Sequence, residues 1–194
     1  ASGLHAFNPR DGMLTTLVDP ESHLPENRFN DGRCDRQGRF LAGTMSDVQR
    51  APTGSLYRFE TGGACTRLFG DLIIPNSLAF SPDGATMYFA DTHRERIMAF
   101  DYDTATGTPS GARLFASTVG HQGRPDGSCV DAEGCLWNCE YGGWRVVRYA
   151  PDGRIDGAIP IPAANPTCCC FGGPDLGTLY ITTATQRLTS VQLA

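Results

Sequence analysis

Three polar side chains occupy the same place in successive segments of the chain. Each stands eight residues before a glycine that opens a short apolar run, in the pairs Asn30 and Gly38, Asn76 and Gly84, and Asp126 and Gly134. Two amide oxygens and one carboxylate form a set of hard ligands that suits Ca²⁺, Mg²⁺ or Mn²⁺. Asn and Asp are also common turn residues, because their side chains bond to nearby backbone groups. The spacing therefore predicts a shared cation site, with ordinary turns as the alternative.

The strands that would carry these side chains follow a recurring pattern. A glycine-containing turn precedes a short apolar-aromatic run at residues 38–43, 54–59, 84–90, 134–137 and 177–181. The glycines at 38, 84, 134 and 177 follow one another at intervals of 46, 50 and 43 residues. A period of about 40–50 residues with about four strands is typical of a β-propeller blade. We therefore predict an all-β propeller, with a β-sandwich as the alternative.

The propeller fold explains how distant residues could form one site. The innermost strand of each blade lines the axis, so Asn30, Asn76 and Asp126 are expected to converge there. A chain of 194 residues holds only about four blades of this period. We therefore expect one propeller domain over residues 1–194, either a small closed ring or part of a larger one.

Composition argues against several classes of function. The net charge is −5 and no basic patch is visible, which argues against a nucleic-acid partner. No segment approaches the roughly 18 apolar residues of a membrane span. The eight cysteines include three consecutive ones, whose alternating directions on a strand suit no simple disulfide pattern. No Cys-x2-Cys pair supports a structural zinc site, so we expect small buried thiols and a cytoplasmic protein.

Four groups of residues carry a resemblance to a known family. They are Arg-Phe-Asn-Asp-Gly at 28–32 with Ala-Gly-Thr-Met at 42–45, the run 76–84, Pro-Asp-Gly at 125–127 with 131–137, and the run 170–175. In this order and spacing the chain resembles the SMP-30/gluconolactonase family, which includes regucalcin and bacterial sugar lactonases. The resemblance covers nearly the whole chain.

The resemblance implies a six-bladed propeller with one divalent cation on its axis, Ca²⁺, Zn²⁺, Mg²⁺ or Mn²⁺. The family's ligands are an N-terminal Glu, two Asn and an Asp. Asn76 and Asp126 match metal ligands, and Asp126 also matches the residue that transfers the proton. Arg28 matches an Arg that contacts the substrate, and Asn30 matches an Asn that faces the substrate and the metal.

These roles imply hydrolysis of a sugar lactone to the aldonic acid, with a small-molecule sugar lactone as the partner. A cation can polarise the carbonyl, and Asp126 can take a proton from water and return it to the ring oxygen. Arg28 offers a planar donor to the substrate. The alternatives are a calcium-binding regulatory propeller without hydrolase activity and an interaction propeller without a metal.

The sequence also departs from the family pattern. Only 27 residues precede Arg28, so we expect the family's N-terminal Glu to be absent from this sequence, and Glu21 and Glu26 are poor substitutes. Asp47 stands near the place of a substrate-binding Glu found in some members. We therefore expect an open propeller that lacks the N-terminal blade region and the closing strand, with weak activity.

Other candidate residues have simpler interpretations. Asp101-Tyr102-Asp103 begins like a calcium-binding loop but lacks its later ligands, so we expect a turn between strands. His93 and His121 are expected in loops where they could face a substrate. Trp137 is expected to pack against neighbouring side chains.

Overall fold

The computed structural model describes residues 3–186 and 188–189. The chain forms two compact units, residues 1–75 and 76–194, and each is described by itself. The prediction of one domain over residues 1–194 stays a prediction. No helix in the described part of the chain is long and apolar enough to cross a membrane.

The first unit contains a hairpin and a four-stranded meander. The hairpin is β1 (Leu4–Phe7) with β2 (Leu14–Val18), and the meander is β3 (Asn27–Cys34), β4 (Phe40–Ser46), β5 (Gly54–Phe59) and β6 (Cys65–Leu72). Each strand of the meander pairs antiparallel with the next. Its core is aromatic, with Ala42, Tyr57 and Phe59 buried and Phe29 packed edge-on against both rings.

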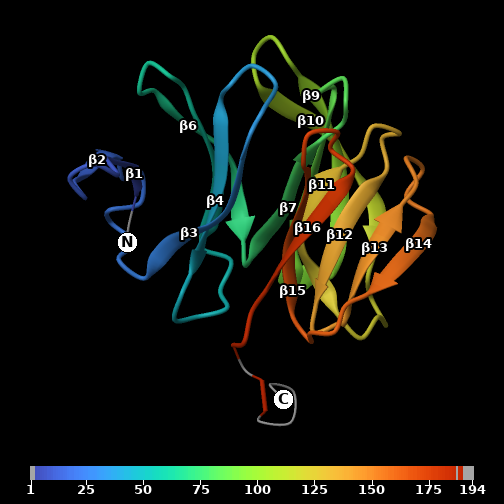
Figure 1. The fold of residues 1–194 in the computed structure, drawn as a ribbon. Helices are drawn as coiled ribbons and strands as arrows, with labels where there is room; N and C mark the ends of the chain where they lie inside the picture. The colour runs from blue at the N-terminus through green and yellow to red at the C-terminus, as the bar shows by residue number, and fades with distance from the viewer. Residues whose placement is uncertain (1–2, 187, 190–194) are drawn as a thin grey trace. The chain divides into compact units, whose positions relative to one another are not determined.

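The described residues of the second unit form two four-stranded sheets, a two-stranded sheet and one 3₁₀ turn (Figure 1). The first sheet is β7 (Pro75–Phe80), β8 (Thr86–Asp91), β9 (Arg96–Asp103) and β10 (Thr108–Ser117), with η1 (Thr92–Arg94) between β8 and β9. The second sheet is β11 (Arg124–Val130), β12 (Leu136–Tyr141), β13 (Arg145–Tyr149) and β14 (Ile155–Pro160), and the pair is β15 (Pro166–Gly172) with β16 (Thr178–Thr183). The strands of each sheet lie side by side in chain order, as propeller blades do.

Apolar side chains hold these sheets against one another. One buried cluster joins the sheets β7–β10 and β11–β14, and its members include Ala90, Ile97, Leu136 and Val147. Leu136 and Ile97 are fully buried, and burying such a side chain stabilises a fold by about 1.5–3 kcal/mol. Strand β15 contacts β11 and β12 through a second buried cluster. Such packing holds β11 and β15, the first strands of two successive sheets, in a fixed position relative to each other.

The recurring glycines lie in the turns between the first and second strands of each four-stranded sheet. The first strands are β3, β7 and β11, and the second strands are β4, β8 and β12. Gly38, Gly84 and Gly134 have φ of +83°, +75° and +81°, a conformation that costs glycine little. The amide of each donates to the carbonyl three residues earlier, at 3.2, 2.9 and 3.1 Å. The equivalence of these segments, predicted from spacing, is therefore confirmed in the backbone.

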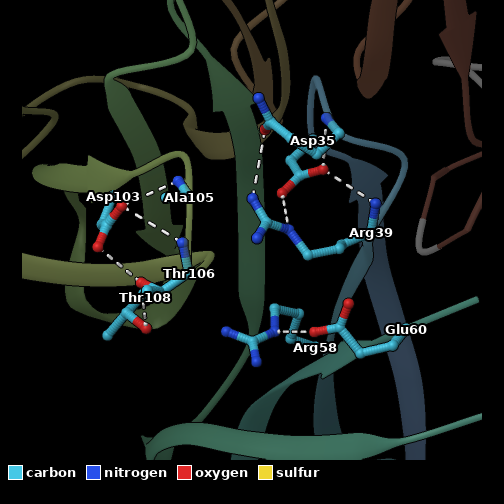
Figure 2. A network of polar contacts seen from close by, with 9 residues as sticks. Asp35, Arg39, Arg58, Glu60, Asp103, Ala105, Thr106 and Thr108 are labelled. Atoms are coloured by element: carbon cyan, nitrogen blue, oxygen red, sulfur yellow. Dashed lines mark hydrogen bonds and ion pairs between the residues drawn. The ribbon is translucent and has the colours of Figure 1, made fainter. Parts of the chain in front are cut away.

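Aspartates brace other turns through their side chains. Asp35 accepts bonds from the Arg39 backbone amide at 2.9 Å and from Arg39 Nε at 2.6 Å (Figure 2). At the end of β9, Asp103 accepts bonds from the Ala105 amide and from the Thr106 amide and hydroxyl (Figure 2). The predicted turn between strands is found at residues 104–107, directly after Asp101–Asp103, which themselves belong to β9.

Candidate metal and substrate site

Two of the predicted site residues lie in bulges of a first strand. The pairing register shifts within residues 29–32 of β3 and within residues 125–128 of β11. Each shift places one extra residue in the first strand, next to Asn30 and Asp126 respectively. Bulges of this kind bend a strand and redirect a side chain, and they are frequent beside active sites.

The third predicted residue has a related irregularity. Asn76 is the second residue of β7, and Ser77 after it has φ of +56°. A positive φ is uncommon for serine and marks a constrained backbone. All three first strands are therefore irregular at the position that the spacing singled out.

Within the second unit, a single threonine links Asn76 to the peptide before Asp126. Asn76 Nδ2 donates to Thr92 Oγ1 at 2.7 Å, and Thr92 Oγ1 donates to the Pro125 carbonyl at 2.6 Å. Asn76 and Thr92 are both buried. Because Pro125 precedes Asp126 directly, the structure brings the segments that carry Asn76 and Asp126 together.

A second buried network holds the Asp126 backbone. The Asp126 carbonyl accepts bonds from Ser77 Oγ at 2.5 Å and from Asn138 Nδ2 at 3.3 Å. Asn138 Nδ2 also lies 2.9 Å from Ser77 Oγ and 2.9 Å from Ser128 Oγ. The bulge that carries Asp126 is therefore tied to β7 and to β12.

The donor set of the second unit fits a hard divalent cation. Asn76 offers an amide oxygen and the half-buried Asp126 offers a carboxylate, the ligand types that Ca²⁺, Mg²⁺ and Mn²⁺ prefer. Asn30, the third predicted oxygen donor, belongs to the first unit. Its convergence with Asn76 and Asp126 stays a prediction.

In the first unit, Arg28 and Asn30 form a more open group. Arg28 Nε lies 2.8 Å from Asp47 Oδ1, and the two side chains are 39% and 60% exposed. Arg28 Nη1 donates to Asn30 Oδ1 at 3.2 Å, and Asn30 Nδ2 donates to the Pro75 carbonyl at 2.9 Å. The hydrogen bond and charge of Arg28 hold the pKa of Asp47 below its usual range. This group presents a planar cation and a carboxylate at the surface.

Glu21 is engaged elsewhere in the first unit. Its carboxylate is buried and accepts bonds from Asn27 Nδ2 at 2.8 Å and from the Tyr57 hydroxyl at 3.0 Å. Burial, with the bond to Glu21, raises the pKa of Tyr57 to about 12. The two bonds give Glu21 a structural role in the first unit.

Comparison with known proteins identifies the family. The model of the SMP-30/gluconolactonase/LRE-like region matches residues 1–185. The chain belongs to this family. Its four-stranded sheets match part of the six-bladed SMP-30 propeller, so the predicted fold class is confirmed.

Curated relatives include both lactonases and regucalcins. Regucalcin of Xenopus laevis is 40% identical over 92% of this chain and 62% of its own length. L-arabinolactonase of Azospirillum brasilense is 40% identical over the whole chain and 64% of its own length. The 6-deoxy-6-sulfogluconolactonase of Pseudomonas putida is 36% identical, with 80% of its length covered. The chain thus spans less than two thirds of the first two of these relatives.

Solved structures give the same result. A regucalcin from Agrobacterium tumefaciens, described as a calcium-binding protein, matches with a TM-score of 0.92 and 41% identity over 98% of this chain and 64% of its own. A gluconolactonase from Xanthomonas campestris matches with a TM-score of 0.78 and 31% identity over 94% of this chain and 62% of its own.

The repeat spacing did not reveal several residues that surround the candidate site of this SMP-30 family chain. Thr92, Ser77 and Asn138 contact Asn76 or the Asp126 backbone, yet none belongs to the repeat spacing. A signal was available: an Asn or Ser within an apolar strand indicates a buried hydrogen-bond network, because buried polar groups need partners.

A buried ion group lies beside the start of β11. Glu140 is fully buried, accepts two bonds from Arg145 at 2.8 and 3.2 Å, and lies 2.8 Å from His121 Nδ1. The bond to Glu140 raises the pKa of Arg145. Glu140 pairs with Pro125 in the β-sheet register, so this group supports the bulge of Asp126. His93 lies in η1 and His121 in the segment between β10 and β11.

The acidic group Asp131, Glu133 and Cys135, whose ligand atoms lie within 4.8 Å of one another, serves a structural role. Arg148 binds Asp131 at 2.8 Å and also pairs with Glu133. Burial works to raise the pKa of Asp131, but hydrogen bonds from Trp137 and Arg148 outweigh it and hold the pKa below its usual range. The arginine already supplies the positive charge that a cation would bring. Trp137 packs edge-on against Phe171, as predicted.

The cysteines divide into buried and accessible thiols. Cys129, Cys139 and Cys169 are buried between β11–β14 and β15–β16, with the Cys129 and Cys169 sulfurs 3.6 Å apart. Cys34 and Cys170 are exposed, so the expectation of buried thiols was wrong for these two. The cytoplasmic location inferred from the thiols stays a prediction.

Proposed function

We propose that this chain carries the cation-binding residues and part of the substrate-binding surface of a metal-dependent sugar-lactone hydrolase. The observation that carries the proposal is the link of Asn76 through Thr92 to the peptide that precedes Asp126. It sets an amide and a carboxylate, two hard donors, on neighbouring first strands. Relatives named L-arabinolactonase and 6-deoxy-6-sulfogluconolactonase support the reaction class.

In this proposal Asn76 and Asp126 hold the cation, which when bound supplies Lewis acidity toward the lactone carbonyl. The Asp126 carboxylate accepts a proton from the attacking water as the water oxygen bonds to the carbonyl carbon. The bond between that carbon and the ring oxygen then breaks, and Asp126 returns the proton to the ring oxygen. The product is the open aldonic acid.

Arg28 and Asn30 bind the substrate in this proposal. The exposed Arg28 guanidinium keeps Asp47 as a partner at 2.8 Å, and its remaining N–H groups can donate to lactone oxygens. Asp47 can accept bonds from sugar hydroxyls. Such groups fix the orientation of a sugar without taking part in bond breaking.

The proposal is tested by lactone hydrolysis after removal of metals by a chelator. Glucono-1,5-lactone and arabinono-1,4-lactone are supplied with Zn²⁺, Mn²⁺, Mg²⁺ or Ca²⁺, and acid release is followed. We expect cation-dependent turnover that Asp126→Asn abolishes and that Asp152→Asn, a change on an exposed turn, leaves unchanged. Turnover that no added cation stimulates would overturn the proposal.

A calcium-binding regulatory propeller without hydrolase activity is the second candidate. It is favoured by relatives named regucalcin and by the related structure described as a calcium-binding protein. Calcium binding by wild type, weakened in Asp126→Asn by the loss of the carboxylate charge, without turnover of any lactone would support this candidate over the hydrolase.

A further inference from the structure

Thr92 has a hydroxyl whose hydrogen is already committed. The Pro125 carbonyl can only accept a hydrogen bond, so the 2.6 Å contact must use the single hydroxyl hydrogen of Thr92. The Thr92 oxygen can therefore only accept from Asn76, at 2.7 Å. The Asn76 side chain must present its NH2 group to Thr92, and its amide oxygen consequently lies on the opposite side of the amide.

This orientation matters for a cation ligand. An asparagine binds a hard cation through its oxygen, whereas a rotated amide would direct its NH2 group at the cation. The reverse orientation would place the Asn76 oxygen against Thr92, which has no second hydrogen to donate. A buried unsatisfied acceptor of this kind costs about 1–3 kcal/mol. The hydroxyl thus selects one of two amide orientations that are nearly equal in shape.

Thr92 is itself held in place by its short turn. It opens η1, where the buried Asp91 carboxylate caps the turn through the His93 amide at 3.2 Å. The Glu95 amide closes the turn on the Thr92 carbonyl at 3.3 Å. Through its hydroxyl, Thr92 then joins β7 to β11, the strands of Asn76 and Asp126.

We propose that Thr92 is a positioning residue of the cation site: it fixes the amide orientation of Asn76 and the approach of Asn76 to the Asp126 segment. This inference rests on the proposed function where it assigns Asn76 and Asp126 to a cation. The orientation of the amide itself does not depend on that assignment.

The test compares Thr92→Val, which keeps the shape and removes the hydroxyl, with Thr92→Ser, which keeps the hydroxyl. Thr44→Val is the matched control, because Thr44 is also buried and its hydroxyl accepts from the Ser55 amide and donates to the Ser55 carbonyl within the first unit. Calorimetric titration with Mn²⁺ and with Ca²⁺ measures cation affinity for each variant.

We expect Thr92→Val to weaken cation affinity by about 10–100-fold, the usual effect of losing a residue that orients a ligand. Thr92→Ser should restore affinity to near the wild-type value. Thr44→Val should lower thermal stability to a similar extent as Thr92→Val and leave cation affinity unchanged. Equal affinity in wild type and folded Thr92→Val would overturn the inference.

A metal-free measurement separates this inference from the proposed function. The Asn76 side-chain NH2 resonances, assigned by their loss in Asn76→Asp, should exchange slowly with water in wild type and in Thr92→Ser, and much faster in Thr92→Val. Wild type that binds no cation but shows this pattern would overturn the proposed function and keep the role of Thr92. Unchanged exchange in Thr92→Val would overturn the role of Thr92 whatever the cation does.

Discussion

Strands β3 and β11 have the same bulge in opposite surroundings. At β11 the Asp126 carbonyl accepts bonds from Ser77 and Asn138, which are fully buried. At β3 Arg28 pairs with Asp47, and both side chains are partly exposed. The same irregularity thus supports a rigid, neutral network in one place and a loose, charged pair in the other.

The difference fits the roles proposed for the two strands. A cation needs its ligands held at fixed distances of about 2.3–2.6 Å, and neutral buried hydrogen bonds hold a backbone without competing for the cation. A substrate must enter and leave, so its contacts benefit from exposed groups that keep their solvation. Changes at β11 should therefore affect chemistry and stability, whereas changes at β3 should affect substrate affinity.

The largest effect is expected at Asp126. Asp126→Asn keeps a ligand oxygen and loses the proton acceptor, so turnover should fall by at least about 100-fold, the lower range for a general base. The midpoint of thermal unfolding should change little, because the backbone bonds of residue 126 remain. Steady-state kinetics and a thermal melt measure both, and a variant with wild-type kcat would show that the base lies elsewhere.

Arg28→Gln should affect binding more than chemistry. Loss of a charged donor to the substrate should raise KM by about tenfold, the value of one hydrogen bond to a charged group. Thermal stability should stay near wild type because the pair with Asp47 is exposed. If Arg28→Gln instead lowered kcat and left KM unchanged, β3 would take part in the chemical step and the contrast between the strands would fail.

Asn138→Leu tests the network behind β11. It removes the donor to the Asp126 carbonyl and to two serine hydroxyls, so the free energy of unfolding should fall by about 1–3 kcal/mol. We expect turnover to fall several-fold. Asn138→Gln should not restore it, because the longer side chain does not fit a site of fixed volume. Denaturant unfolding measures the stability, and wild-type values for both stability and turnover would show that the network does not brace Asp126.

Tyr57→Phe tests a braced region that lies outside the proposed site. Folding raises the pKa of Tyr57 from 10.0 to about 12, so the folded chain keeps a proton that the unfolded chain loses. This stabilisation is complete below pH 10 and is lost as the pH rises through about 12. Tyr57→Phe should lack this alkaline decline, be less stable at neutral pH by about 1–3 kcal/mol because Glu21 loses a donor, and keep its kinetic constants.

Denaturation midpoints of wild type and Tyr57→Phe between pH 8 and pH 12 measure this difference, because this range spans the pKa of Tyr57 in the unfolded and in the folded chain. Parallel pH profiles for wild type and Tyr57→Phe would show that another group controls alkaline stability.

Much of this arrangement could be predicted from the sequence because the chain repeats. The glycines at 38, 84 and 134 have the same positive φ, and the common offset placed Asn30, Asn76 and Asp126 on equivalent first strands. A repeat makes equivalent backbone positions, so spacing alone locates them.

The residues that orient the ligands could not be found in this way. Thr92 contacts Asn76 across 16 positions, and Asn138 contacts Ser77 across 61. The contact of Asn138 with Ser77 depends on packing between two sheets, and that of Thr92 with Asn76 depends on the short turn after β8. Neither contact belongs to the spacing of the repeat. The convergence of Asn30 with the other two residues depends on how the two units are arranged, and it stays a prediction together with the open form of the propeller.

The central claim is that Asn76 and Asp126 bind the same divalent cation. Its most direct test is an anomalous-scattering map from crystals grown with Mn²⁺. We predict one peak bonded to the Asn76 amide oxygen and an Asp126 carboxylate oxygen at about 2.1–2.6 Å. A peak at Asp131 and Glu133 instead, or none near Asn76 and Asp126 at saturating Mn²⁺, would contradict it.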